Sequence, residues 1–361
     1  MFRLSLMETG SGECMSKDTC GVAESNNASG RPVDTLSRDR LISLIGWGAI
    51  LGIFLADMLL FRVTGIGLSY SNVIGKILML IVALWPVMAV ATRLTGFGVG
   101  AEVIAENVAK FCLLTYAACL LSYFLAASPM PLQDRYIVKM DALLGFDWPS
   151  FYAFVSSHHS LAQLFRYFYA GLTPQGFLIM MVVGVIYPQR PNYFIMAYIV
   201  SLLIIFTLFF FVPVAGAFVY FQHLDLPAAR FCEHFLQMRN HTMSAIPMDD
   251  LRGIIQFPSF HVSSAVILTY FFRRLPVIFP LAVAVNAGMS VAALYVGGHY
   301  LTDVIAGVGV AVVTIAIVRR LEGPEPELRL AWTRPKLPTS REIRASALAT
   351  LAPVGGERSE S

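Results

Sequence analysis

The sequence predicts an all-α integral membrane protein with about eight transmembrane helices. Hydrophobic residues make up 57% of the 361 residues and charged residues only 14%, whereas soluble domains carry about 25% charged residues. The mean hydropathy is +0.67. Apolar runs recur along the chain, and several approach the roughly 20 residues that a helix needs to span a bilayer. These observations favour one helical membrane domain over two or three soluble domains.

The two ends of the chain are polar. Residues 1–40 are rich in Gly, Ser and Asn and lack the apolar core of a cleavable signal peptide. We expect them to form a disordered cytoplasmic tail. Residues 320–361 are rich in Pro, Arg and Glu and are expected to be a second cytoplasmic tail, mostly disordered.

Eight segments between the tails have the composition of spans. Short turns such as YPQRPN at 187–192 separate some of them, because proline cannot continue a helix. The connections at 128–172 and 215–258 are long, and the first contains aromatic stretches that are favoured at a membrane interface. The candidate spans are 41–61, 73–93, 104–127, 173–188, 193–214, 259–275, 277–296 and 299–319.

The orientation follows from the arginines in short loops, which are enriched on the cytoplasmic side. Arg190, the pair at 273–274 and the pair at 319–320 fall on one side of an eight-span chain. This places both tails in the cytoplasm and both long connections outside. All seven histidines then lie on the outer side. We therefore expect a multi-pass protein of the inner (cytoplasmic) membrane with an outward-facing site.

The charge and the cysteines exclude several other classes of function. The net charge is only +3, and no Lys/Arg cluster alternates with aromatic residues. Nucleic acid is therefore not expected as a partner. The five cysteines form neither a disulfide framework nor a metal-binding pattern.

Two motifs place histidines at the outer ends of spans. The first is GIIQFPSFHVSSAV at 253–266, with His261, and the second is VGGHYLTDVIAG at 296–307, with His299. One helical hairpin fits into the 38 residues between them, so the chain returns to the same membrane face. The spacing predicts that the two histidines meet.

The residues around these histidines suggest roles for both rings. Asp303 lies four residues after His299, on the same helix face, where it can hold one imidazole nitrogen and leave the other as a nucleophile. His261 is the candidate general acid. Ser259 opens its helix, whose free N–H groups suit a phosphate. Gly298 allows a ligand or backbone to approach closely.

A metal site is the rival interpretation of the same residues, since two histidines and one carboxylate can hold a divalent ion. No further outer-side ligand is evident in the sequence. We therefore predict metal-independent chemistry without a cofactor.

The two motifs resemble those of the type 2 phosphatidic acid phosphatase superfamily, and within it the branch of inositol-phosphorylceramide synthases. HYLTDV is also similar to the last motif of the sphingomyelin synthases. The resemblance covers about residues 104–319 and implies a six-helix phosphatase or phosphotransferase core there, after two extra N-terminal helices in 41–103. It also implies transfer through a phosphohistidine, with His299 as the nucleophile.

Some basic residues of the family pattern are missing. No Lys-x6-Arg-Pro motif is present, and Ala292 and Ala293 stand where the phosphatases carry Ser-Arg. Phe260 replaces a frequent Gly. A cation must still neutralise the phosphate, and Arg239 and Arg252 are the candidates.

The predicted function is thus a lipid phosphatase or inositolphosphotransferase-like enzyme that acts on a lipid-linked phosphate. Water would attack the phosphoenzyme in hydrolysis, and an alcohol, such as a polyol, in transfer. The alternative is a catalytically silent lipid-phosphate binding protein or transporter of the same fold. The missing basic motifs favour this alternative, whereas the complete set of two histidines and one aspartate favours an enzyme.

Overall fold

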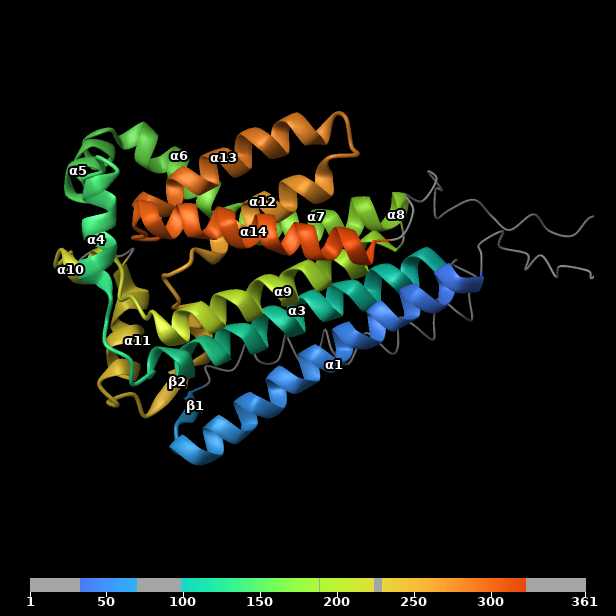
Figure 1. Cartoon of the computed structure of the whole chain (residues 1–361), viewed down its shortest axis with the longest axis horizontal. Coiled ribbons are helices and arrows are strands. Elements are labelled where there is room, and N and C mark those ends of the chain that lie inside the picture. The colour runs from blue at the N-terminus through green and yellow to red at the C-terminus, as the bar shows by residue number, and fades with distance from the viewer. Residues whose placement is uncertain (1–32, 70–98, 188, 224–228, 323–361) are drawn as a thin grey trace, which may run out of the picture.

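The computed structural model describes residues 33–69, 99–187, 189–223 and 229–322, and these residues are mostly helical. Six long or apolar helices form a bundle along one axis (Figure 1). They are α1 (Val33–Thr64), α3 (Val99–Ala126), α9 (Arg190–Phe211), α12 (Phe260–Phe272), α13 (Ile278–Val296) and α14 (Leu301–Leu321).

Five of these helices are long and apolar enough to cross a membrane, namely all but α12. α12 has 13 residues and ends where Arg273 and Arg274 begin a turn. A sixth span is formed if two bent helical segments are counted as one. The predicted total of eight is therefore not confirmed. The candidate span at 73–93 lies outside the described residues.

The bent span is the region where the structure differs most from the predicted boundaries. α6 (His159–Ala170) is followed at Gly171 by α7 (Leu172–Leu178), a π-helical turn η1 (Ile179–Val183) and α8 (Gly184–Ile186). The helix axis bends by 41° between α6 and the segment from α7 to α8. The aromatic stretch LFRYFY at 164–169 belongs to the connection 128–172, which was expected at the membrane interface. It thus forms part of the first arm of this span.

Short elements gather at one end of the bundle (Figure 1). They include α4 (Asp134–Leu143), α5 (Trp148–Ser157), α10 (Ala217–Tyr220) and α11 (Arg230–Arg239). A small parallel sheet pairs β1 (Gly67–Ser69) with β2 (Ala245–Pro247), and a 3-10 turn, η3 (Met248–Asp250), follows β2. This sheet is a minor addition to the predicted all-α fold.

The helix α4 has two different faces. Asp134, Ile137 and Asp141 are buried against the bundle. Met140 and Leu143 point outward, with exposed fractions of 49% and 88%. The helix therefore presents apolar side chains to its surroundings and carboxylates to the protein interior.

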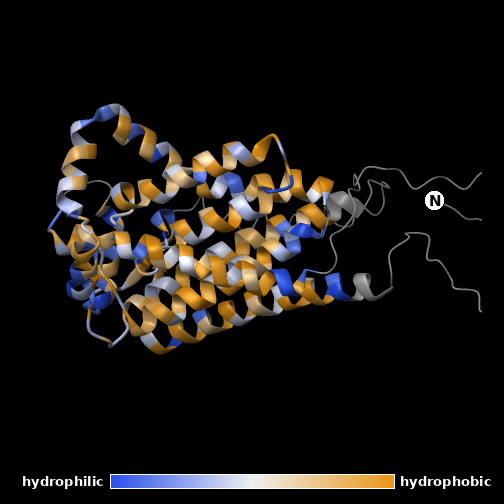
Figure 2. Ribbon diagram, turned by 45° about the horizontal axis from the view of Figure 1, so that its top comes forward, coloured by the Kyte–Doolittle hydropathy of each residue, from blue (hydrophilic) through white to orange (hydrophobic). Residues whose placement is uncertain are grey.

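The three last helices bring the two sequence motifs together. α12 and α13 form a hairpin, and α14 returns beside α12, so the N-termini of α12 and α14 share the end that holds the short elements (Figure 1). At the other end, Arg38 Nη2 donates a hydrogen bond to the carbonyl of Arg320. Hydrophobic residues predominate along the helices between these ends (Figure 2). The short helices α4, α5, α10 and α11 of the two long connections therefore lie at the same end as the motifs.

Candidate active site

The start of α14 carries the first part of the site. Tyr300 caps the helix, and its backbone N–H donates to Asp303 Oδ2 over 2.9 Å. Asp303 is fully buried, and His299 is 3% exposed. His299 Nδ1 lies 3.4 Å from the same carboxylate oxygen, slightly beyond the usual range for an N–H···O hydrogen bond. His299 and Asp303 are therefore neighbours, as their spacing predicts, while His299 Nδ1 and Asp303 Oδ1 are buried without a hydrogen-bond partner.

The surroundings of His299 keep its imidazole neutral. Burial lowers the pKa of His299 to about 4, against the opposing effect of a hydrogen bond to the backbone of Gln256. A neutral ring has a lone pair available for attack near pH 7. A carboxylate next to such a ring can stabilise a positive charge on it.

The start of α12 contacts the start of α14 directly. The backbone N–H of Ser259 donates to the carbonyl of Asp303 over 3.1 Å. The Ser259 side chain caps α12 by accepting from the N–H of Val262 over 3.5 Å. A Cβ at Gly307 would lie only 2.6 Å from the carbonyl oxygen of Ser259. The glycine therefore allows the close approach that joins the two motifs.

His261 packs against an aromatic ring that the sequence did not single out. The rings of His261 and Tyr169 are stacked, with centroids 4.0 Å apart and planes at 15°. A Cβ at Gly297 would be 2.8 Å from the Tyr169 hydroxyl and 2.7 Å from a ring carbon of His299. Tyr169 thus reaches from one histidine to the neighbourhood of the other.

Gly298 has a conformation that explains its residue type. Its φ is +61°, in the region that favours glycine, and a Cβ would lie 2.3 Å from the ring of Phe218. Its carbonyl accepts a hydrogen bond from the N–H of Ala217. The close approach expected at this glycine is therefore made by the protein itself, on the side of α10.

Two buried carboxylates of α4 hold the catalytic end of α14. Asp141 accepts hydrogen bonds from the N–H groups of Leu301 and Thr302, both at 2.8 Å, and from the Thr302 hydroxyl at 2.6 Å. Asp134 accepts from the Tyr300 hydroxyl at 2.9 Å and from the N–H groups of residues 215 and 216. Their seven-residue spacing puts them on one face of α4. In the sequence, this spacing is the one sign that the two carboxylates act together.

The two candidate phosphate-binding arginines differ in position. Arg239 donates to the backbone carbonyls of Ser128 and Met130, so its guanidinium is engaged at the end of α3. Arg252 is paired with Asp250 at 2.5 Å, and its side chain is 45% exposed. Of the two guanidinium groups, that of Arg252 is the more exposed, and its printed partner is a side chain and not the backbone.

No group of three or more His, Cys, Asp or Glu side chains in the described ranges is placed to hold a metal ion. The site thus consists of two histidines and a buried carboxylate at the junction of two helix N-termini. Such an arrangement can provide a nucleophile, a proton donor and N–H groups for an anion.

The comparisons with known proteins agree with this site at the level of the family. Neither a curated protein nor a solved structure matched the chain. A family model described as the PAP2 superfamily matches residues 135–317, just over half of the 361 residues. The matched range begins in α4 and contains both histidine motifs. The chain therefore belongs to the PAP2 superfamily.

Proposed function

We propose that this protein is a membrane phosphatase or phosphotransferase that acts on a lipid-linked phosphate through a phosphohistidine on His299. Members of the PAP2 superfamily are generally phosphatases. The observation that carries the proposal is the direct junction of the two motifs, in which Ser259 N–H binds the Asp303 carbonyl and His299 lies beside the Asp303 carboxylate.

In the first half-reaction, His299 Nε2 attacks the phosphorus, because Nδ1 faces Asp303. A P–N bond forms while the P–O bond to the leaving group breaks. His261 donates a proton to the departing oxygen. The Asp303 carboxylate stabilises the imidazolium, in the role of the third group of a catalytic triad.

In the second half-reaction, a hydroxyl group attacks the phosphorus of the phosphohistidine, and the P–N bond breaks. His261 takes the proton from the attacking oxygen, which restores both histidines. Water as the attacking group gives hydrolysis, and an alcohol such as a polyol gives transfer to a new lipid. Transfer in the manner of an inositol-phosphorylceramide synthase is the specific form that the sequence resemblance favours.

The phosphate oxygens would be bound at the junction of the helix N-termini. The backbone N–H groups after Ser259 and the backbone at Gly298 contribute donors, and Arg252 contributes a positive charge. Arg239 remains the weaker candidate, because a phosphate would have to compete with two backbone carbonyls for its guanidinium.

The site is proposed to face the outside of the cytoplasmic membrane. The support for this orientation is that Arg190, Arg273, Arg274, Arg319 and Arg320 are all at the opposite end of the bundle, and basic residues in short loops are enriched on the cytoplasmic side.

Two cysteine substitutions test this orientation in a cysteine-free background. Leu143 and Val277 are 88% and 87% exposed and lie at opposite ends of the bundle. In intact cells, a membrane-impermeant thiol reagent should label Leu143→Cys and not Val277→Cys. The reverse pattern would place the site on the cytoplasmic face.

The catalytic proposal is tested with purified protein, labelled phospholipids and polyols, with and without a chelator. Wild type should form a phosphoenzyme that survives an alkaline quench, and His299→Ala should form none. His159 is exposed at the start of α6 and is not part of the proposed site, so His159→Ala is a matched control that should behave as wild type. His261→Ala should still react with a nitrophenyl phosphodiester or monoester, because that leaving group needs no proton.

The same assay separates the alternatives. Product identity distinguishes hydrolysis from transfer. Full activity in His299→Ala, or label on His261, would contradict the assigned roles. A loss of activity on adding chelator that zinc restores would favour a metal bound by the same three residues. An inactive wild type that still binds labelled lipid would support the silent binding protein or transporter.

A further inference from the structure

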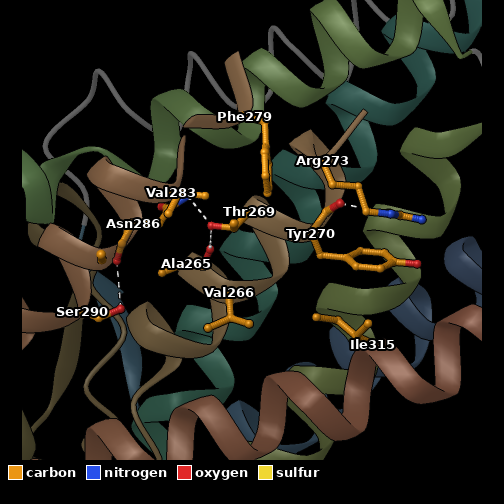
Figure 3. Close-up of a pocket in the computed structure, with 11 residues that line it drawn as sticks. Ala265, Val266, Thr269, Tyr270, Arg273, Phe279, Val283, Asn286, Ser290 and Ile315 are labelled. Carbon is orange, nitrogen blue, oxygen red and sulfur yellow. Dashed lines mark hydrogen bonds between the residues drawn. The ribbon is translucent and has the colours of Figure 1, made fainter. Parts of the chain in front are cut away.

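A groove lies between α12, α13 and α14; it begins at Ala265 and Val266, the last residues of the first histidine motif, and extends along α12 to Arg273 (Figure 3). Its volume is about 460 Å³. Val266, Phe279 and Ile315 provide apolar walls, and the uncharged polar side chains of Thr269, Asn286 and Ser290 also line it. The groove has the size and the mostly apolar lining of a site for a hydrocarbon chain.

The groove is accessible from the outer surface of the bundle. Val283, which lines it, is 42% exposed, and Ala287 on the next turn of α13 is also exposed. α13 is one of the helices that can span the membrane. The surroundings of this opening are therefore lipid hydrocarbon, and a lipid chain can enter from the bilayer.

Three arginines stand at the end of the groove. Arg273 lines the groove itself and lies over the ring of Tyr270, 3.6 Å from its centroid. Arg190 and Arg274 lie 5.8 and 6.0 Å from the centroid of one ring, that of Tyr187. The charges of Arg273 and Arg274 both act on Arg190. The three guanidinium groups therefore form one cluster, which we call the arginine cluster.

Arg190 is the least satisfied member of the arginine cluster. Only 4% of the residue is exposed, and its Nε and Nη2 atoms are buried without a hydrogen-bond partner. Its other neighbour is the apolar ring of Phe271, at 5.5 Å. A buried guanidinium with unpaired donors is costly, and it is a group suited to bidentate binding of phosphate.

One carboxylate in the described part of the chain faces the arginine cluster. Glu322 lies 3.6 Å from Arg273 and accepts a hydrogen bond from the Tyr270 hydroxyl at 2.8 Å. Its charge also reaches Arg190. Among the described residues, the arginine cluster thus brings three positive groups and one carboxylate to the end of an apolar groove.

We propose that this groove and the arginine cluster together bind an anionic phospholipid, with one acyl chain in the groove and the phosphate on Arg190, Arg273 and Arg274. Basic pockets between transmembrane helices are known places for anionic headgroups. The site is separate from the histidine junction, because both α12 and α14 run from that junction to the arginine cluster. About 20 Å of helix lies along the 13 residues of α12. The lipid belongs to the leaflet opposite the candidate active site.

The test is native mass spectrometry of the delipidated full-length protein. The probes are phosphatidylglycerol, phosphatidylcholine with the same acyl chains, and inorganic phosphate. Phosphatidylglycerol should bind at least about tenfold more tightly than phosphatidylcholine, which corresponds to about 1.4 kcal/mol. Inorganic phosphate should not displace it, because the acyl chain contributes to the affinity.

Two variants separate the groove from the cluster. Ala287→Trp, at an exposed position, should fill the groove and lower phosphatidylglycerol binding about tenfold. Arg274→Gln should reduce the preference for phosphatidylglycerol over phosphatidylcholine. Val291→Trp is the matched control, since Val291 is exposed on the same helix but does not line the groove. Its binding should be unchanged.

Three results would overturn the proposal. They are equal binding of the two lipids, wild-type binding by Ala287→Trp, and complete displacement of phosphatidylglycerol by inorganic phosphate. The last result would assign the arginine cluster to a free anion. Because none of these measurements uses turnover, they are independent of whether His299 is catalytic.

Discussion

Removing the Asp141 carboxylate should destabilise the catalytic end of α14. Asp141 is 3% exposed and accepts three hydrogen bonds from Leu301 and Thr302. In Asp141→Ala, the two backbone N–H donors lose their partner, at about 1–3 kcal/mol each. The free energy of unfolding should therefore fall by about 2–6 kcal/mol, which corresponds to a fall in Tm of roughly 5–20 °C for a domain of this size.

Asp147→Ala is the matched control for this prediction. Asp147 also caps a helix, but it is a solvent-accessible cap that accepts one backbone hydrogen bond, from Ser150 at 3.0 Å. Loss of such a cap costs about 1 kcal/mol. Thermal unfolding of both variants in one detergent, followed by circular dichroism, measures the difference. Equal Tm values for the two variants would refute the view that Asp141 holds α14.

The turnover of Asp141→Ala provides a second measurement at a temperature where the variant is folded. His299 is two residues before Leu301, the first residue that Asp141 binds, and a displacement of about 1 Å at a reacting group can cost about 10²-fold in rate. We therefore expect kcat to fall by about that factor while the amount of folded protein is unchanged. A wild-type kcat would show that His299 is positioned by other contacts.

Three further predictions concern single residues of the site. Gly298→Ala should lower the free energy of unfolding by about 2–5 kcal/mol, because the φ of this residue is +61° and a Cβ would lie 2.3 Å from an aromatic ring. Gly309→Ala is the control: a Cβ there has nothing within 4 Å, so this variant should be neutral or stabilising in the same unfolding assay. Arg252→Gln should lower turnover about 10²–10³-fold at unchanged Tm. Arg239→Gln should mainly lower Tm, because its hydrogen bonds to two backbone carbonyls are lost. The opposite pattern would make Arg239 the phosphate-binding residue and Arg252 the structural one. Burial lowers the pKa of His299 to about 4. The rate of phosphoenzyme formation from a nitrophenyl substrate should therefore stay constant from pH 7 down to about 5.5 and fall only as the pH approaches 4. A midpoint near pH 6.5, the pKa of a free imidazole, would contradict this prediction.

Hydropathy located the helices well where each span is continuous. The predicted spans 193–214 and 277–296 correspond to Arg190–Phe211 and Ile278–Val296. The prediction was less accurate at 173–188, because the helix continues backward across Gly171 into α6 with a 41° bend. Aromatic residues in α6 pack on α13, and such tertiary packing has no local signature in the sequence.

The candidate site was only partly predictable. His299 and Asp303 are four residues apart, and this short spacing is sufficient to place them together. His261 could be added because one hairpin returns the chain to the same end. Tyr169 and Asp141 could not be found in this way. Their partners lie far away in the sequence (Asp141 is 160 and 161 residues from the groups it binds), so the contacts depend on how separate helices pack.

The two faces of α4 link the bilayer to the reaction. The same ten-residue helix exposes Met140 and Leu143 on one side and binds the N-terminus of α14 through Asp141 on the other. Under the proposed function, a shift of α4 would therefore displace His299 through Asp141 and the start of α14. We expect turnover to depend on the lipid packing around α4, so that exchanging a bilayer for a detergent micelle changes the rate even when the substrate and every residue of the site stay the same.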